Sequence, residues 1–123
     1  TRRETMPTGT MLILSGSTDG RGILIAATAT PGTLIHTAVT GTADHDSIWI
    51  WAVNSTATTR LLTIEFGGVT SPADTIDDNI PTDDNSILMV PGWILRNALI
   101  VRGFAAAASA GSCFGYVLRY DAA

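Results

Sequence analysis

The sequence contains no lysine, and its seven basic residues are all arginines, against eleven acidic residues. The formal net charge is −4 at neutral pH. A chain of this kind has no positive field that would gather phosphate groups. We therefore expect no nucleic acid partner and no membrane partner.

Cysteine is nearly absent as well, since Cys113 is the only one. A single thiol cannot form an internal disulfide, so nothing indicates a secretory redox environment. Runs of about 18 apolar residues are also missing, as is a charged segment followed by a long apolar one. These absences predict a soluble protein made in a cytoplasm. We expect Cys113 to be buried, because it lies between Ser112 and Phe114 in a strand.

The residues that are present favour one folded all-β domain. The 123 residues are 46% hydrophobic and 15% charged, which is typical of a single globular domain. The eighteen threonines favour pleated strands over helices, because branched β-carbons lose rotamer freedom in a helix. Turn-forming residues separate eight short apolar runs, at residues 11–14, 23–30, 33–40, 48–53, 60–66, 87–90, 94–102 and 114–120.

This spacing predicts an antiparallel β-sandwich or barrel of about eight strands over residues 10–123. Residues 1–9 are polar and include Arg2, Arg3 and a proline. We expect them to form an extended N-terminal arm, not a packed element.

Several of the runs are apolar on both faces. In the run 48–53, Ile48 and Ile50 lie on one face while Trp49 and Trp51 lie on the other. In a two-layer sandwich each sheet has only one face on the core. The outer faces are therefore covered either by loops and the arm of the same chain or by other subunits. We favour a homo-oligomer in which the two tryptophans anchor the contact.

No pattern in the sequence points to catalysis. The two histidines are His36, within a strand, and His45, within Asp44-His45-Asp46. On a strand the central residue of such a triplet points away from its neighbours, so the metal signal is weak and a turn before the next strand is the favoured interpretation. We expect no catalytic residue, no cofactor and no metal. A small β-barrel enzyme with His36, His45 and nearby Asp residues around a metal is a minor alternative.

The stretch 74–84 holds five carboxylates and no basic residue. We expect a solvated loop there. A cation site is conceivable because hard cations bind several carboxylate oxygens, although the EF-hand pattern is absent. The stretch could also form charge-assisted pairs with Arg2 and Arg3 of a neighbouring subunit.

Some segments resemble a known class of proteins. The segments are Leu14–Ile23, Ile48–Asn54 continuing to Leu62–Gly68, Val90–Gly92, and Val101–Ala106. Together they resemble small virion proteins encoded in the structural gene clusters of tailed bacteriophages, and in particular capsid decoration (cement) proteins.

That resemblance implies a jelly-roll or related β-sandwich, assembled as a homotrimer on the capsid exterior. Such a protein binds the major capsid protein and stabilises the phage head. We expect the oligomer or capsid interface to include Trp49, Trp51, Trp93, Phe104, Arg2 and Arg3. The alternative is a trimeric tail-fibre or baseplate β-sandwich domain that binds a host-surface glycan, with Trp93 stacking on sugar rings.

Overall fold

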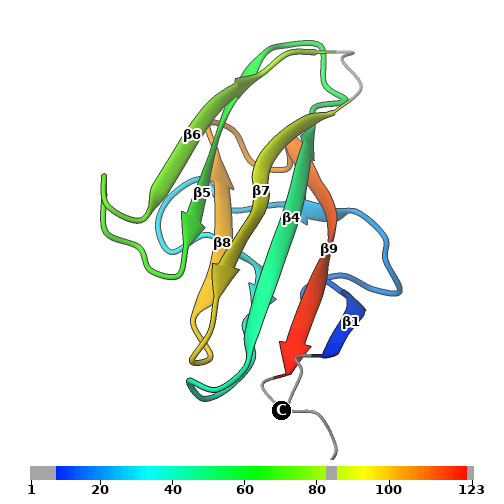
Figure 1. The fold of residues 1–123 in the computed structure, drawn as a ribbon. Coiled ribbons are helices and arrows are strands. Elements are labelled where there is room, and N and C mark those ends of the chain that lie inside the picture. Colours follow the sequence, from blue (N-terminus) through cyan, green and yellow to red (C-terminus); the bar gives the residue numbers. More distant parts are fainter. Residues whose placement is uncertain (1–7, 83–85, 122–123) are drawn as a thin grey trace, which may run out of the picture.

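The computed structural model describes residues 8–82 and 86–121. Within these ranges the protein is all-β and forms two antiparallel sheets (Figure 1). The described residues form nine strands: β1 (Thr8–Ile13), β2 (Ile23–Ile25), β3 (Thr33–Thr37), β4 (His45–Val53), β5 (Arg60–Phe66), β6 (Thr75–Ile80), β7 (Ile87–Leu95), β8 (Ile100–Ala105) and β9 (Gly111–Asp121). A search of the described residues finds no helix with the length and apolar character needed to cross a membrane.

The first sheet has the strand order β1-β9-β4-β7, and the second has the order β3-β8-β5-β6. The short strand β2 also belongs to the first sheet. It pairs with Gly111–Cys113 at the start of β9, while β1 pairs with Tyr116–Asp121 along the same edge. Strands far apart in the chain are therefore neighbours, because β9 lies between β1 and β4 (Figure 1).

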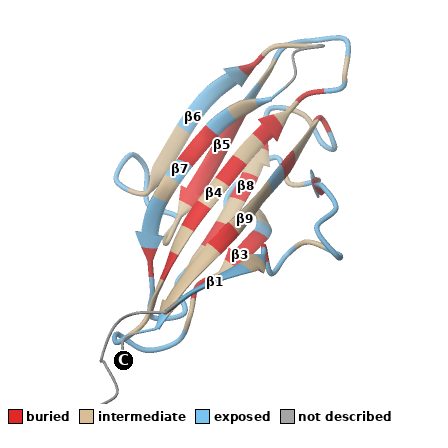
Figure 2. Cartoon of the chain, turned by 45° about the vertical axis from the view of Figure 1, so that its right-hand side comes forward, coloured by how far each residue is buried: buried red, intermediate tan, exposed pale blue. Residues whose placement is uncertain are grey.

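The two sheets face each other across one hydrophobic core, in a sandwich-like arrangement. Along β4 every second residue is buried, which Figure 2 shows as alternating red and tan bands. Ile48 and Ile50 of β4 pack into the same core cluster as Ile64 and Val101 of the second sheet. Cys113 is fully buried in this cluster, which confirms the expectation from the sequence.

The acidic stretch 74–84 is not the solvated loop that we expected, because it contains strand β6. Ile76 and Ile80 face the core, whereas Asp77 and Asn79 lie on the opposite side and are exposed. Charged residues on an edge strand discourage pairing with other chains, which explains how a strand can carry so many carboxylates. Asp83 and Asp84 lie outside the described residues.

The apolar run 94–102 is likewise not one strand. Strand β7 ends at Leu95 and β8 begins at Ile100, with a turn between them in which Asn97 and Ala98 have φ values of 66° and 57°. Positive φ at two successive residues is the backbone of a tight turn. Strand β7 also continues through Pro91-Gly92, where the sequence suggests a stop, and its pairing with β4 shifts register there.

Most of the expected N-terminal arm lies outside the described residues. Residues 1–7, which include Arg2 and Arg3, are not among the described residues. The last two residues of the expected arm are already part of β1, in which Thr8 pairs with Asp121 and Gly9 with Tyr120.

Candidate functional site

The outer face of the first sheet is mostly apolar. We call it the aromatic face and define it by the side chains that alternate with the core positions: Met11, Ile13, Leu24, His45, Ser47, Trp49, Trp51, Val53, Leu88, Pro91, Ile94, Ser112, Phe114, Tyr116, Leu118 and Tyr120. None of these described residues is Asp, Glu, Lys or Arg. An uncharged face across a whole sheet is unusual for a surface that stays in water.

Three large rings form the centre of this face. Trp49 and Trp51 follow each other on one side of β4, and Tyr116 pairs with Trp49 from β9. The ring centroids lie 6.4 Å apart for the two tryptophans and 6.0 Å apart from each tryptophan to Tyr116, and Trp49 is inclined by only 19° to each of the other two rings. Pairs at such separations add to the stability gained from burial.

The rings lie close against the sheet. A Cβ placed on Gly92 would come within 2.6 Å of Trp49 Cζ2, and one placed on Gly22 would come within 2.5 Å of Phe114 Cζ. Only a residue without a side chain leaves room for these rings. The aromatic side chains therefore lie close over the strand backbone and do not project far from the sheet.

The margins of the aromatic face are strongly exposed. Met11 is 68% exposed and Ile94 61%. A cavity of about 420 Å³ opens at one end, lined by Trp51, Val53, Ser86 and Phe114. Contiguous apolar surface of this kind marks an interaction site.

The structure distributes the expected interface residues over separate places. Trp49 and Trp51 lie together on the aromatic face. Trp93 lies on the edge strand β7, where it is 44% exposed and packs edge-on against Phe66 with centroids 5.9 Å apart. Phe104 lies on the outer side of the second sheet, paired with Thr63. Arg2 and Arg3 are outside the described residues.

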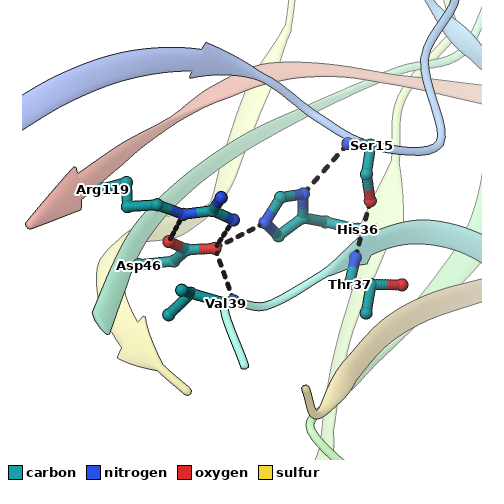
Figure 3. Close-up of polar contacts among 6 residues, drawn as sticks. All are labelled: Ser15, His36, Thr37, Val39, Asp46 and Arg119. Atoms are coloured by element: carbon teal, nitrogen blue, oxygen red, sulfur yellow. Dashed lines mark hydrogen bonds and ion pairs between the residues drawn. The ribbon is translucent and has the colours of Figure 1, made fainter. Parts of the chain in front are cut away.

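A second group of polar side chains is buried between the sheets (Figure 3). The carboxylate of Asp46 on β4 is fully buried and accepts two hydrogen bonds from Arg119 on β9, at 2.7 and 3.0 Å. Its Oδ2 also lies 2.8 Å from Nε2 of His36 on β3 and accepts a bond from the backbone N–H of Val39. A buried charge needs this number of partners.

The hydrogen bonds determine which nitrogen of His36 carries the proton. The backbone N–H of Ser15 donates to Nδ1 of His36 at 3.0 Å, so Nδ1 is an acceptor and Nε2 carries the hydrogen that points to Asp46. Burial lowers the pKa of His36, and this outweighs the opposite effect of Asp46. His36 is therefore neutral at physiological pH.

The pKa values of the other two groups move in the directions expected for an ion pair. Burial alone would raise the pKa of Asp46, but the hydrogen bonds and charges of Arg119 and His36 outweigh it and lower that pKa. The hydrogen bond to Asp46 raises the pKa of Arg119. Asp46 is consequently ionised at physiological pH, and its charge is balanced by Arg119.

The hydrogen bonds of this network stabilise the fold, and their arrangement does not match a nucleophilic triad. The Ser15 side chain accepts a bond from the backbone N–H of Thr37 at 2.7 Å, while only the Ser15 backbone reaches the imidazole. A triad requires the hydroxyl itself to bond to the base. Both nitrogens of His36 are already engaged.

The expected turn at Asp44–Asp46 is wrong in its second half, because β4 begins at His45. Asp46 binds partners distant in sequence because its side chain points into the core and not along its own turn. His45 lies apart from His36 and stacks on Tyr120 with centroids 5.4 Å apart. Among the described residues, no group of three His, Cys, Asp or Glu side chains is arranged to hold a metal ion.

Sequence reasoning missed one further buried acid, Glu65 on β5. Its side chain is fully buried although it points away from the core. Glu65 Oε1 accepts a bond from the backbone N–H of Gly32 at 2.7 Å, and Oε2 accepts one from the Thr30 hydroxyl at 2.5 Å. No local signal reveals this burial, because it comes from a loop that folds over the strand.

Comparison with protein-family models, with curated proteins and with solved structures gave no match.

Proposed function

We propose that this chain is a non-enzymatic virion structural protein, namely a capsid decoration (cement) protein of a tailed bacteriophage. In this proposal the protein forms a homo-oligomer, with a trimer favoured, on the capsid exterior and binds the major capsid protein to stabilise the head. The observation that carries the proposal is the uncharged aromatic face, which is a surface suited to contact between subunits.

The order of the strands supports a jelly roll. If β1 and β2 are counted as two segments of one edge strand, the sheets are four-stranded, with orders β1/β2-β9-β4-β7 and β3-β8-β5-β6. Eight strands in two such sheets are the arrangement of jelly rolls, which build viral capsid domains but also lectins and cupins. The strand order is therefore consistent with a capsid protein but does not distinguish it from other jelly-roll proteins. The main support for the capsid proposal comes from the aromatic face.

The dimensions of the aromatic face support a partner of substantial size. Four strands about 4.8 Å apart, crossed by nine residues of β4 at about 3.3 Å each, outline on the order of 500 Å² in plan. A standard interface buries about 800 Å² on each partner. Since side-chain relief increases the accessible area, this single face supplies most of what a stable contact needs.

The distribution of charge favours a second copy of the chain as the partner of the aromatic face. The net charge of −4 makes copies repel one another in general, but the aromatic face contributes no charge to that repulsion. Interfaces between identical subunits are also more apolar than other interfaces. The acidic edge strand β6 and the arm residues Arg2 and Arg3 then remain for contacts with neighbouring subunits or the capsid.

The test is reconstitution on phage heads that lack this protein. We expect the purified oligomer to bind such heads in a fixed ratio, to produce added density on the outer shell in cryo-electron microscopy, and to delay the release of DNA on heating. Heads that acquire no density for this chain would refute the proposal.

The second candidate is a trimeric tail-fibre or baseplate domain that binds a host-surface glycan. The exposed ring of Trp93, held edge-on against Phe66, favours it, since exposed aromatic rings stack on sugars. Labelled antibody against the protein separates the two candidates: binding to heads supports decoration, and binding to tails supports the fibre.

A further inference from the structure

The two sheets end in four edge strands, and two of these strands carry features that prevent pairing with another chain. Strand β6 has the exposed carboxylates of Asp77 and Asp78. Strand β7 contains Pro91, which has no N–H, and it shifts register against β4 beside this proline. Charges, prolines and bulges are the usual protections of an edge strand.

The third edge strand, β3, is covered by the chain itself. The backbone N–H of Gly16 donates to the carbonyl of Ile35 at 2.8 Å, and the N–H of Thr37 donates to the Ser15 hydroxyl at 2.7 Å. Residues 15–16 therefore already bind backbone groups of β3 that a strand from another chain would need. An edge that is covered in this way is closed to further pairing.

The fourth edge strand, β1, has none of these protections. Its six residues contain no charge and no proline, and they pair with β9 without a register shift (Figure 1). About half of the N–H and C=O groups of an antiparallel edge strand point away from its neighbour. Within residues 8–82 and 86–121, the backbone of β1 makes hydrogen bonds with β9 alone. An uncharged, regular edge of this kind is a template for a further strand.

Charge and symmetry favour a second copy of the chain as that further strand. Copies with a net charge of −4 repel one another in general, but β1 contributes no charge to the repulsion. Met11 and Ile13 are 68% and 51% exposed at this edge, so a neighbouring strand would cover apolar side chains. A strand that pairs antiparallel with its own copy is self-complementary, as a two-fold contact requires.

We propose that β1 pairs antiparallel with β1 of a second copy about a two-fold axis perpendicular to the sheet. The two first sheets then form one continuous sheet, with both aromatic faces on the same side. Six residues form a contact well below the standard size of about 800 Å² per partner, so the pairing is weak and needs concentrated protein. The inference goes beyond the decoration proposal and does not depend on it.

The register of this pairing is limited by the geometry of a sheet. Directly opposed residues share a face, so a strand that pairs with its own copy must place one residue opposite itself. Thr10 and Met11 are the two residues nearest the centre of β1. One of them therefore lies on or next to the two-fold axis.

The first experiment measures amide hydrogen exchange of the full chain by NMR at micromolar and millimolar concentrations. We expect exchange of about three β1 amides to slow about tenfold in the concentrated sample, because their outward N–H groups then bond to the second copy. Thr10→Lys should remove this protection, since it places two like charges near the axis. The matched control Asn79→Lys makes the same charge change at an exposed residue of β6 and should keep the protection.

The second experiment is cysteine crosslinking of Thr10→Cys and Met11→Cys. Opposed Cβ atoms in a sheet lie about 4.5–5.5 Å apart, so the variant whose cysteine opposes itself should form an intermolecular disulfide under mild oxidation. Cys113 does not compete because it is buried. Asn79→Cys is the control and should stay monomeric on a non-reducing gel.

The variant Trp51→Asp separates this contact from contacts through the aromatic face. Thr10 lies on the other side of β1 from Met11, so Thr10→Lys leaves the aromatic face unchanged. We expect Trp51→Asp to retain the concentration-dependent protection of β1. Exchange of β1 that is independent of concentration, protection that survives Thr10→Lys, protection lost in Trp51→Asp, or no crosslink from either cysteine variant would each overturn the proposal. None of these results depends on binding to phage heads, so failure here is distinguishable from failure of the decoration proposal.

Discussion

Nε2 of His36 on β3 lies 2.8 Å from Oδ2 of Asp46 on β4, and this contact joins the two sheets through the core. Asp46 is held at the same time by Arg119 of β9. The charged Asp46 thus occupies a core-facing position of β4 at which alternation predicts an apolar side chain. The position of one sheet relative to the other therefore depends on directional hydrogen bonds. Buried polar networks that are fully bonded can specify one arrangement of a core.

Asp46→Asn should destabilise the fold strongly. The substitution removes the negative charge and replaces one acceptor oxygen by an amide group, so it weakens the hydrogen bonds to Arg119 and His36; losing hydrogen bonds to a charged group costs about 1.5–3 kcal/mol. Urea unfolding followed by tryptophan fluorescence measures the change. The matched control Asp78→Asn, at an exposed carboxylate, should stay within about 0.5 kcal/mol of the wild type. Equal midpoints for the two variants would contradict the role of the network.

Stability should fall when the pH drops below about 6.5. Burial lowers the pKa of His36 in the folded state, so the unfolded chain takes up a proton first and is favoured as the pH falls. One such proton gives a slope of at most about 1.4 kcal/mol per pH unit. Urea midpoints between about pH 5 and pH 8 report it.

The matched pair His36→Gln and His45→Gln identifies the responsible histidine. His36→Gln should remove the slope, whereas His45→Gln should retain it. An NMR titration of wild-type imidazole signals gives the same answer without a variant, because the His36 signal should titrate below the ordinary range. A slope that His45→Gln abolishes would show that the wrong histidine has been assigned.

Cys113 should not react with thiol reagents in the native protein. Burial raises the pKa of its thiol to about 12, and its side chain is fully enclosed in the core. Both effects deprive a reagent of the accessible thiolate that it needs. With Ellman's reagent we expect no release of colour from native protein and one equivalent per chain in denaturant. Rapid native labelling would show that β9 opens readily.

Trp51→Asp should prevent oligomerisation. A carboxylate at the centre of the aromatic face would be buried without a partner in the contact, at a cost of several kcal/mol. Multi-angle light scattering should give the mass of a single chain. Leu61→Asp is the control, since Leu61 is 40% exposed and lies on the outer side of the second sheet. An unchanged mass for Trp51→Asp would place the contact elsewhere.

Thr63→Val should leave stability unchanged or raise it by up to about 1 kcal/mol. The hydroxyl that it removes has no partner within the described residues, and an apolar group of the same shape removes a desolvation penalty. Thermal unfolding by circular dichroism measures the difference. A clear loss of stability would indicate that the hydroxyl has a structural role.

The periodicity of the sequence was sufficient to predict the all-β class and the two faces of β4. Alternation along residues 48–53 correctly separates Ile48 and Ile50, which are buried, from Trp49 and Trp51 on the opposite face. In the structure Glu65 lies on the outer side of β5, as the two-residue period of a strand requires. This period does not predict that Glu65 is buried, because a loop more than thirty residues away in sequence supplies the cover.

Strand boundaries were less predictable where local signals conflict with packing. Pro91-Gly92 resembles a stop, yet β7 continues because a register shift against β4 absorbs the irregularity. The carboxylates of 74–84 resemble a loop, yet Ile76 and Ile80 pack against the core and hold the segment in the sheet. In both places tertiary contacts outweigh weak local preferences.

The sequence by itself determined that this chain folds into strands, that it carries no concentrated positive charge and that one side of β4 is aromatic, because these properties follow from composition and from the two-residue period of a strand. Only the tertiary structure decided which strands are neighbours. It joined Asp46 to Arg119, 73 residues later, and assembled one face without Asp, Glu, Lys or Arg side chains from five strands. Pairing partners are chosen by the packing of the whole chain, and that choice leaves no local mark on the residues involved.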